Sequence, residues 1–261
     1  MTPIALITDF GTTDWYVGAM KGAIAAIAPD TPIIDITHDI LPADIRHASY
    51  ILSAAHTAFP RRTVFCVVVD PGVGGSRKCI AVKTDDYIFI GPDNGVLSWI
   101  CQSAEKCEVR SIENESLYRK ESSATFHGRD IFGPVAAYCA AGFPFKKIGP
   151  VTTDFVIRPL PQAVVKEGSI TAPILSIDRF GNIITAIRQD TFEQKDTTEF
   201  QFTVRKQRFR CGMKTHFEEV AAGEPLCYIG SSGFIEIALN RGNAAQYFGV
   251  TTEDSIEMLL P

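Results

Sequence analysis

The sequence lacks any hydrophobic run long enough to span a bilayer, which takes roughly 20 apolar residues in succession. Its opening stretch, MTPIALITDFG, has no basic residue before a short apolar segment and reaches Asp9 early, so no secretory signal peptide is predicted. These absences argue against a membrane protein and predict a cytoplasmic location.

The sequence also lacks CxxC cysteine motifs and an excess of positive charge. The seven cysteines include no CxxC motif, so we expect neither a disulfide framework nor a zinc finger, and most of the thiols should be small core residues in a reducing compartment. The 25 Lys and Arg residues are outnumbered by 30 Asp and Glu, which argues against a broad nucleic-acid face. Small molecules or proteins are the expected partners.

The motifs of phosphate-binding loops are absent as well. The glycine-rich stretch VVVDPGVGGSRK, residues 67–78, lacks the GxxxxGK[ST] spacing, and ITDFGTTDW lacks GxGxxG. A nucleotide cofactor held through its pyrophosphate is therefore not expected. A turn explains the glycines without any chemistry, because Pro-Gly suits a type II turn and the later glycines permit positive φ.

The chain does have alternating apolar and amphipathic segments over its first 150 residues. Strands are predicted at 3–9, 32–37, 63–70, 79–84 and 87–93, of which 3–9 and 63–70 should be buried. Helices are predicted at 15–28, after a cap at Asp44, at 94–104 and at 129–141. Strand, helix, strand in succession predicts an α/β fold with a mostly parallel central sheet flanked by helices.

The pattern changes after a segment rich in proline and turn residues. Short strands with little helix follow at 170–178, 182–187, 199–204 and 234–240. We therefore predict an α/β domain over residues 1–155, a linker over 156–168 and a smaller all-β domain over 169–261.

Three acidic residues, Asp9, Asp70 and Asp93, lie at or near the carboxyl ends of apolar runs, each before a glycine-containing loop. Ligands bind at that edge of an open α/β sheet, so the three acids are candidates for one shared crevice. The alternative is that aspartates punctuate strands and cap helices.

Two further residues carry candidate chemistry. Arg77 follows Asp70 by seven positions, and a loop that folds back would set its guanidinium against that carboxylate, although a surface arginine is the alternative. His127 precedes a predicted helix, where a hydrogen-bonded histidine without catalytic function is the simpler interpretation. A metal site would draw on Asp9, Asp70, Asp93, His127 and Asp130, but no HxH or HxxxH spacing supports one.

Several motifs together resemble one family, the S-adenosyl-L-methionine (SAM) hydroxide adenosyltransferases, or SAM hydrolases, which are related to the SAM-dependent fluorinase and chlorinase. The matching stretches are ITDFGTTDWYVGAMKG, DITHDI, VVDPGVGGSRK, GPDNGVL, FHGRDIFGPVAA, IDRFGNIITAI and SSGFIEIALNRGNAA. They follow one another in order over nearly the whole chain. The resemblance implies a barrel-like carboxyl-terminal domain and a homotrimer in which that domain completes the SAM site of a neighbouring subunit.

The resemblance also assigns residues to roles. It implies catalysis by Asp70, Arg77 and His127, with Asp9 on the ribose diol. By the same resemblance, Asp14 and Asp178 match positions near the methionine amine of the substrate. Ser231 and Ser232 match positions around its carboxylate, and Phe180 and Asn182 match the adenine region. The resemblance implies that SAM is the substrate, and it implies neither a cofactor nor a metal.

The implied reaction is attack of water on the ribose C5′ of SAM, which releases adenosine and L-methionine. The alternatives are a SAM-dependent halogenase and a non-catalytic adenosyl-binding module. Against the first, the halogenating relatives carry an uncharged residue in place of Asp70 and an arginine where this chain has Ser232, and the region around Arg241 aligns poorly with them. Against the second, a binding module has no use for the Asp-Arg-His set.

Overall fold

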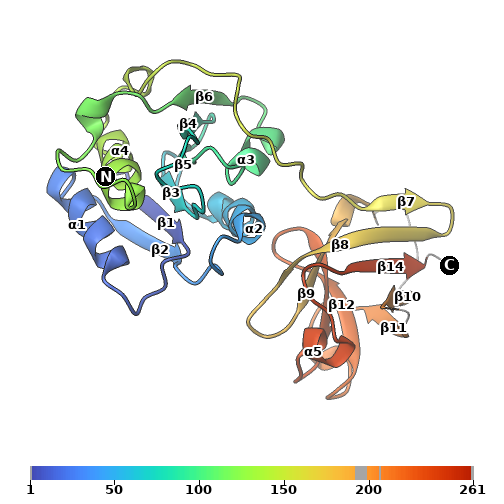
Figure 1. Cartoon of the computed structure of the whole chain (residues 1–261). Coiled ribbons are helices and arrows are strands. Elements are labelled where there is room, and N and C mark those ends of the chain that lie inside the picture. The colour runs from blue at the N-terminus through green and yellow to red at the C-terminus, as the bar shows by residue number, and fades with distance from the viewer. Residues whose placement is uncertain (1, 192–198, 206, 260–261) are drawn as a thin grey trace. The chain divides into compact units, whose positions relative to one another are not determined.

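The computed structural model describes residues 2–191, 199–205 and 207–259. It divides the chain into two compact units, Met1–Leu160 and Pro161–Pro261. Figure 1 shows the first unit in blue to yellow-green, with helices around a sheet, and the second in yellow to red, built mainly of strands.

The first unit is built on a six-stranded sheet in the order β2-β1-β3-β5-β4-β6. The strands are β1 (Ile4–Thr8), β2 (Ile33–Thr37), β3 (Val64–Val68), β4 (Cys79–Lys83), β5 (Ile88–Pro92) and β6 (Glu108–Ser111). The pairs β1–β2, β1–β3 and β3–β5 are parallel, whereas β4 runs antiparallel to both β5 and β6. The sheet is therefore mostly parallel, as the sequence predicts.

Helices cover both faces of this sheet. They are α1 (Tyr16–Ile27), α2 (Ile45–Ala55), α3 (Ser98–Ser103) and α4 (Gly133–Ala140), the last preceded by a π-helical turn at Gly128–Phe132. Alternate residues of β1 enter two hydrophobic cores, Leu6 beside residues of α1 and α4, and Ile7 beside residues of α2 and α3. Strands buried on both faces explain the continuous apolar runs in the sequence.

Local side-chain bonds set two helix starts. Asp44 caps α2, because its carboxylate accepts from the His47 N–H at 2.9 Å, as predicted. The helix predicted from residue 94 begins only at Ser98. Asn94 accepts from the Val96 N–H at 3.1 Å, and Gly95 has φ of 95°, so this stretch is a turn.

The second unit contains a closed seven-stranded β-barrel, because its sheet runs β14-β10-β11-β12-β13-β9-β8-β7 and β14 also pairs with β8. Its strands are β7 (Val164–Lys166), β8 (Ser169–Ile177), β9 (Ile183–Arg188), β10 (Glu199–Val204), β11 (Gln207–Met213), β12 (Pro225–Ile229), β13 (Phe234–Leu239) and β14 (Ser255–Leu259). A short helix, α5 (Ala244–Phe248), precedes β14. The predicted barrel-like all-β domain is confirmed.

The segment predicted as a linker, 156–168, is ordered at both ends. The Val156 N–H donates to the Asp93 carboxylate at 2.8 Å, and the Arg158 N–H donates to the Ser98 hydroxyl at 3.0 Å, which fixes this end to the first unit. At its other end the segment forms β7. Within the described ranges, every helix is too short or too polar to cross a membrane.

Candidate active site

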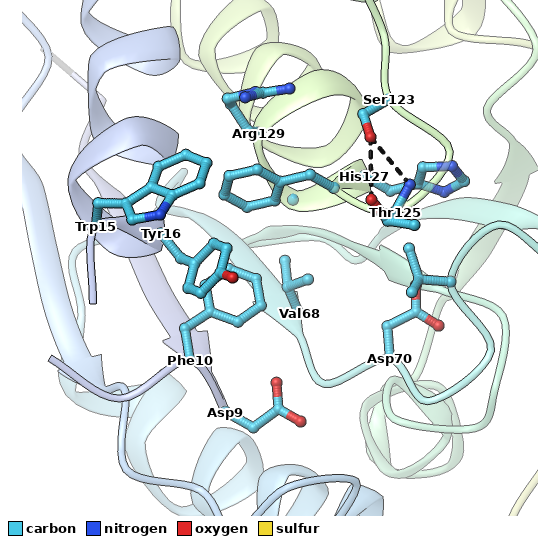
Figure 2. A pocket seen from close by; sticks show the side chains of 13 residues that line it. Asp9, Phe10, Trp15, Tyr16, Val68, Asp70, Ser123, Thr125, His127 and Arg129 are labelled. Carbon is cyan, nitrogen blue, oxygen red and sulfur yellow. Dashed lines mark hydrogen bonds between the residues drawn. The ribbon is translucent and has the colours of Figure 1, made fainter. Parts of the chain in front are cut away.

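Two of the predicted acids meet at one edge of the sheet. Asp9 and Asp70 follow the neighbouring strands β1 and β3, whose last residues Thr8 and Val68 are paired in parallel register. Both acids line a cavity of about 530 Å³ in the first unit. Figure 2 shows the two carboxylates along the same side of this cavity.

The loop between Asp70 and Arg77 folds back, as the sequence suggests. Gly74, at φ of 77°, allows this turn to pass against the backbone of another loop, because a Cβ there would lie 2.4 Å from the Ala124 carbonyl oxygen. Arg77 Nε donates to both carboxylate oxygens of Asp70, each at 3.0 Å, and its Nη2 donates to Oδ2. The side chains of Asp70 and Arg77 are only 4% and 10% exposed, so this is a buried ion pair.

Arg77 also reaches His127, 50 residues further along the chain. Its Nη2 lies 2.7 Å from His127 Nδ1. A guanidinium only donates, so Nδ1 must be the acceptor and the neutral ring carries its proton on Nε2. Burial, with the Arg77 charge adding to it, lowers the pKa of His127, which keeps the ring neutral at pH 7.

Two further contacts hold the guanidinium in place. Arg77 Nη1 donates to Cys79 Sγ at 3.0 Å, and the guanidinium carbon lies 5.4 Å from the centre of the Phe132 ring. With Asp70 and His127 on its other nitrogens, Arg77 is the centre of a fixed network.

Asp9 has a different environment. Its Oδ2 accepts from the Ala43 N–H at 3.0 Å. Burial raises the pKa of the Asp9 carboxyl; the Ala43 bond opposes this rise and the charge of Asp70 adds to it. Asp9 is therefore positioned by the chain between α2 and β2 and carries no arginine partner among the described residues.

An aromatic wall lines the same cavity, and the sequence analysis missed it. Phe10, Trp15, Tyr16 and Phe126 contact one another through their rings, with centroids 4.8 to 6.2 Å apart. Trp15 and Tyr16 remain 60% and 39% exposed, which leaves apolar surface open to a ligand. The sequence does carry a signal for this wall, because Phe10, Trp15 and Tyr16 follow Asp9 within seven residues and Phe126 directly precedes His127.

Asp93 does not join this cavity, so the prediction of one crevice for three acids is wrong in that part. Its carboxylate accepts from the Val156 N–H and is buried. The neighbouring Asn94 is structural as well, because its amide donates to the Val69 carbonyl oxygen at 2.8 Å. Asp93 holds the chain that leaves the first unit.

The acid of the FHGRD motif, Asp130, is fully buried and satisfied by other partners. Arg129 donates to it at 2.7 and 2.9 Å, and the Ser123 N–H donates to it at 2.7 Å. In the part of the chain that the structure describes, no three His, Cys, Asp or Glu side chains are grouped to hold a metal ion. The five residues proposed for a metal site are thus not assembled as one.

Asp14 and the substrate residues of the second unit lie elsewhere. Asp14 is exposed, just ahead of α1, and is not among the residues that line the first cavity. In the second unit, Asp178, Phe180 and Asn182 line a separate cavity of about 630 Å³. Sequence reasoning did not predict the other aromatic walls of that cavity, Phe217 and Tyr228.

Asp178 organises its turn. It accepts from the Phe180 and Asn182 N–H groups at 2.9 and 2.8 Å, and from the Asn182 amide at 2.8 Å. Asn182 is buried, whereas Phe180 is 76% exposed. A fixed amide beside a bare aromatic ring suits a flat heterocycle.

Ser231 and Ser232 lie in the turn between β12 and β13. Backbone bonds from Gly230 to Phe234 at 2.8 Å and from Gly233 to Gly230 at 2.9 Å close this turn. Neither serine is among the residues lining the second cavity, whereas Arg241 is.

Comparisons with known proteins match the chain to one protein family over most of its length. Residues 4–149 match the SAM hydroxide adenosyltransferase N-terminal domain, and residues 172–257 match the C-terminal domain. The chain is 36% identical to the (R)-S-adenosyl-L-methionine hydrolase of Salinispora tropica, over 98% of this chain and 97% of that one. The fluorinase of Actinopolyspora mzabensis is 25% identical, over 98% of this chain and 96% of that protein.

A solved structure is similar along the whole length. The crystal structure of an uncharacterized conserved protein from Thermotoga maritima matches with a TM-score of 0.95 and 40% identity, and covers 98% of this chain and all of that one.

Proposed function

The chain belongs to the SAM hydroxide adenosyltransferase family, and we propose that it is a SAM hydrolase that converts SAM and water to adenosine and L-methionine. The observation that carries the proposal is the unbroken network from Asp70 through Arg77 to His127, which borders a cavity large enough for a small ligand. A module that only bound an adenosyl group would have no need of this network.

In the proposed reaction a water oxygen attacks the ribose C5′, and the electrons of the C5′–S bond go to the sulfonium sulfur. Sulfur then leaves as the neutral thioether of methionine, so no acid is needed on that side. The nucleophile loses one proton, and in this scheme Asp70 accepts it, because Asp9 is assigned to the ribose hydroxyls. Positioning of water and C5′ supplies the rest of the acceleration.

Arg77 and His127 have supporting roles in this scheme. Arg77 fixes the Asp70 carboxylate through Nε and Nη2, so the carboxylate cannot rotate away from the cavity. The same guanidinium holds Nδ1 of His127, which leaves an N–H on Nε2 to orient the water or the ribose. The three residues act as one positioned group.

Other residues are proposed for binding. Asp9 accepts from the ribose hydroxyls, and the Trp15 and Tyr16 rings cover an apolar part of the substrate. From the resemblance, we assign Asp14 and Asp178 to the methionine amine, Ser231 and Ser232 to its carboxylate, and Phe180 and Asn182 to the adenine.

The residues of the second unit act on a neighbouring subunit's cavity in this proposal, within a homotrimer. The resemblance suggests the assembly, and the separate cavity around Phe180 and Asn182 is consistent with it. No cofactor and no metal take part.

The charge of Asp70 favours water over halide. A halide about 4 Å from this carboxylate would be repelled by about 4 kcal/mol at an effective dielectric constant near 20, or about three decades in binding. Arg77 offsets part of this repulsion because it is paired with the same group. Transfer of hydroxide rather than halide follows.

One incubation tests the reaction and its alternative together. Purified protein is given SAM in ¹⁸O-labelled water with excess chloride, and the products are identified by mass spectrometry. We expect labelled oxygen in the 5′-hydroxyl of adenosine, together with L-methionine. Chlorinated adenosine as the main product, or unlabelled adenosine, would overturn the assignment.

A further inference from the structure

Two cysteine sulfurs that belong to neither cavity described above lie next to each other. Cys101 is in α3 and Cys107 precedes β6, and their Sγ atoms are 2.6 Å apart. Both side chains are half-buried and line a cavity of about 370 Å³ that shares no residue with the one around Asp70. A spacing of six residues has no standard motif, which is why the sequence did not predict this pair.

The remaining five cysteines differ from this pair. Cys66, Cys139, Cys211 and Cys227 are buried in the cores, and Cys79 accepts a hydrogen bond from Arg77. Burial raises the pKa of Cys139 to about 12, so that thiol stays protonated and unreactive. Only at residues 101 and 107 do contact between sulfurs and access from a cavity coincide.

Hydrogen bonding between the sulfurs prepares one thiol for reaction. It lowers the pKa of Cys107 and raises the pKa of Cys101, because the first thiolate to form is stabilised by the remaining S–H. A thiolate beside a neutral thiol is the arrangement that thiol–disulfide exchange uses.

We propose that Cys101 and Cys107 are a redox modification site, oxidised to an intramolecular disulfide by a small-molecule disulfide. The Cys107 thiolate attacks one sulfur of the reagent and expels one thiolate, which leaves a mixed disulfide on Cys107. Cys101 then loses its proton, and its sulfur attacks Cys107 Sγ and expels the second thiolate. The protein dithiol is oxidised by two electrons, and one disulfide is reduced to two thiols.

A metal is a poorer match than a disulfide for this pair. A dithiol alone is an incomplete ligand set, since zinc sites use four ligands or three with a water. Among the described residues, no third His, Cys, Asp or Glu lies close enough to form a metal-binding group with the two sulfurs. The short sulfur contact needs only a small approach to reach the bond length of about 2.05 Å.

The disulfide between Cys101 and Cys107 would form beside residues 156–160, at the end of the first unit. Gln102, next to Cys101, donates to the Arg158 carbonyl oxygen at 2.8 Å and accepts from the Leu160 N–H at 3.3 Å. Linking α3 to the start of β6 would keep the end of this helix from opening. We therefore expect the oxidised protein to show slower amide exchange at residues 98–107 and 156–160.

Peptide mapping of the full chain tests the proposal. Trypsin cuts after Lys83, Lys106 and Arg110, so the two cysteines fall on separate peptides, 84–106 and 107–110, each with one cysteine. The protein is treated with oxidised glutathione, its remaining thiols are alkylated, and it is digested without reductant. We expect these two peptides as one linked species that separates on reduction, and two fewer alkylated thiols than the seven cysteines allow.

Matched variants separate this pair from the other thiols. The linked species should disappear in Cys101→Ser with Cys107→Ser, and should persist in Cys139→Ser, which removes a cysteine from the same unit. Dithiothreitol should restore both thiols fully. Free thiols at both positions after oxidation, glutathione adducts without the link, or links only to other cysteines or other chains would each refute the proposal.

Discussion

The substitution Asp70→Asn removes one charge from the buried network and keeps its shape. Arg77 Nε donates to both carboxylate oxygens, so whichever way the new amide turns, its NH₂ group faces an N–H of Arg77. The two side chains are too buried for this to be a surface pair worth less than about 1 kcal/mol. Breaking such a pair costs about 3 to 5 kcal/mol, and Arg77 retains its contacts with His127 and Cys79, so we expect the free energy of unfolding to fall by about 3 kcal/mol.

The effect on catalysis should be larger than the effect on binding. Without a proton acceptor beside the water, kcat should fall by about 10² to 10⁴, whereas the Kd of SAM should change only a few-fold. Adenosine release measured by chromatography gives kcat, isothermal titration gives Kd, and urea unfolding gives stability. These three measurements separate chemistry from binding and from folding.

Asp93→Asn is the matched control. Asp93 is also a buried aspartate after a strand of the same sheet, but its Oδ1 accepts from a backbone N–H, which an asparagine oxygen can replace. This variant should keep kcat within about threefold, because Asp93 lies outside the first cavity. If Asp70→Asn also kept kcat within that range while folded, the role proposed for Asp70 would be wrong.

Three further results are expected. The value of kcat/KM should fall on acidification with an apparent pKa below about 6.5, because the pKa of His127 is lowered and protonation of its ring would break the hydrogen bond from Arg77. The free energy of unfolding should fall over the same pH range, because the unfolded chain binds that proton more readily than the folded chain. Asp9→Ala should raise the Kd of SAM about 10- to 150-fold, the loss of a hydrogen-bonded charge, with a small change in kcat measured at saturating SAM. Mixing Asp70→Asn chains with Phe180→Ala chains, followed by subunit exchange, should restore activity above either variant alone.

Each of these has a contrary outcome. For the pH profile, an acid limb that persists unchanged in His127→Gln would assign it to another group. A large fall in kcat with unchanged Kd in Asp9→Ala would move Asp9 from binding to chemistry. Mixtures no more active than the average of the two variants would contradict a site shared between subunits.

Local patterns predicted the parts of the fold that depend on nearby residues. The apolar runs predicted β1 and β3, because strands buried on both faces need few polar residues. The run IIDIT predicted β2 as well, although this strand lies at the edge of the sheet and is partly exposed. Asp44 predicted the start of α2, because a cap acts over three residues. The helix predicted at 94–104 began late, since bonds from Asn94 compete with the helix there.

Part of the candidate site could be predicted because the residues concerned lie close together in the sequence. Asp70 and Arg77 are seven residues apart, so a single turn could be seen to join them. The position of Asp93 at the carboxyl end of an apolar run placed it in the same crevice, wrongly, because its partner Val156 is 63 residues away and leaves no local signal in the sequence. The aromatic wall was missed since its rings come from two segments more than a hundred residues apart.

By itself, the sequence determined the two-domain pattern of α/β followed by all-β, the family motifs and the residue types of the Asp-Arg-His set. Only the tertiary structure decided which of these side chains touch, because parallel pairing of β1 with β3 brings Asp9 beside Asp70, and the π-helical turn brings His127 to Arg77. It also decided that Cys101 and Cys107 meet. Periodicity reports which face of an element is buried, whereas contact between distant residues depends on how whole elements pack.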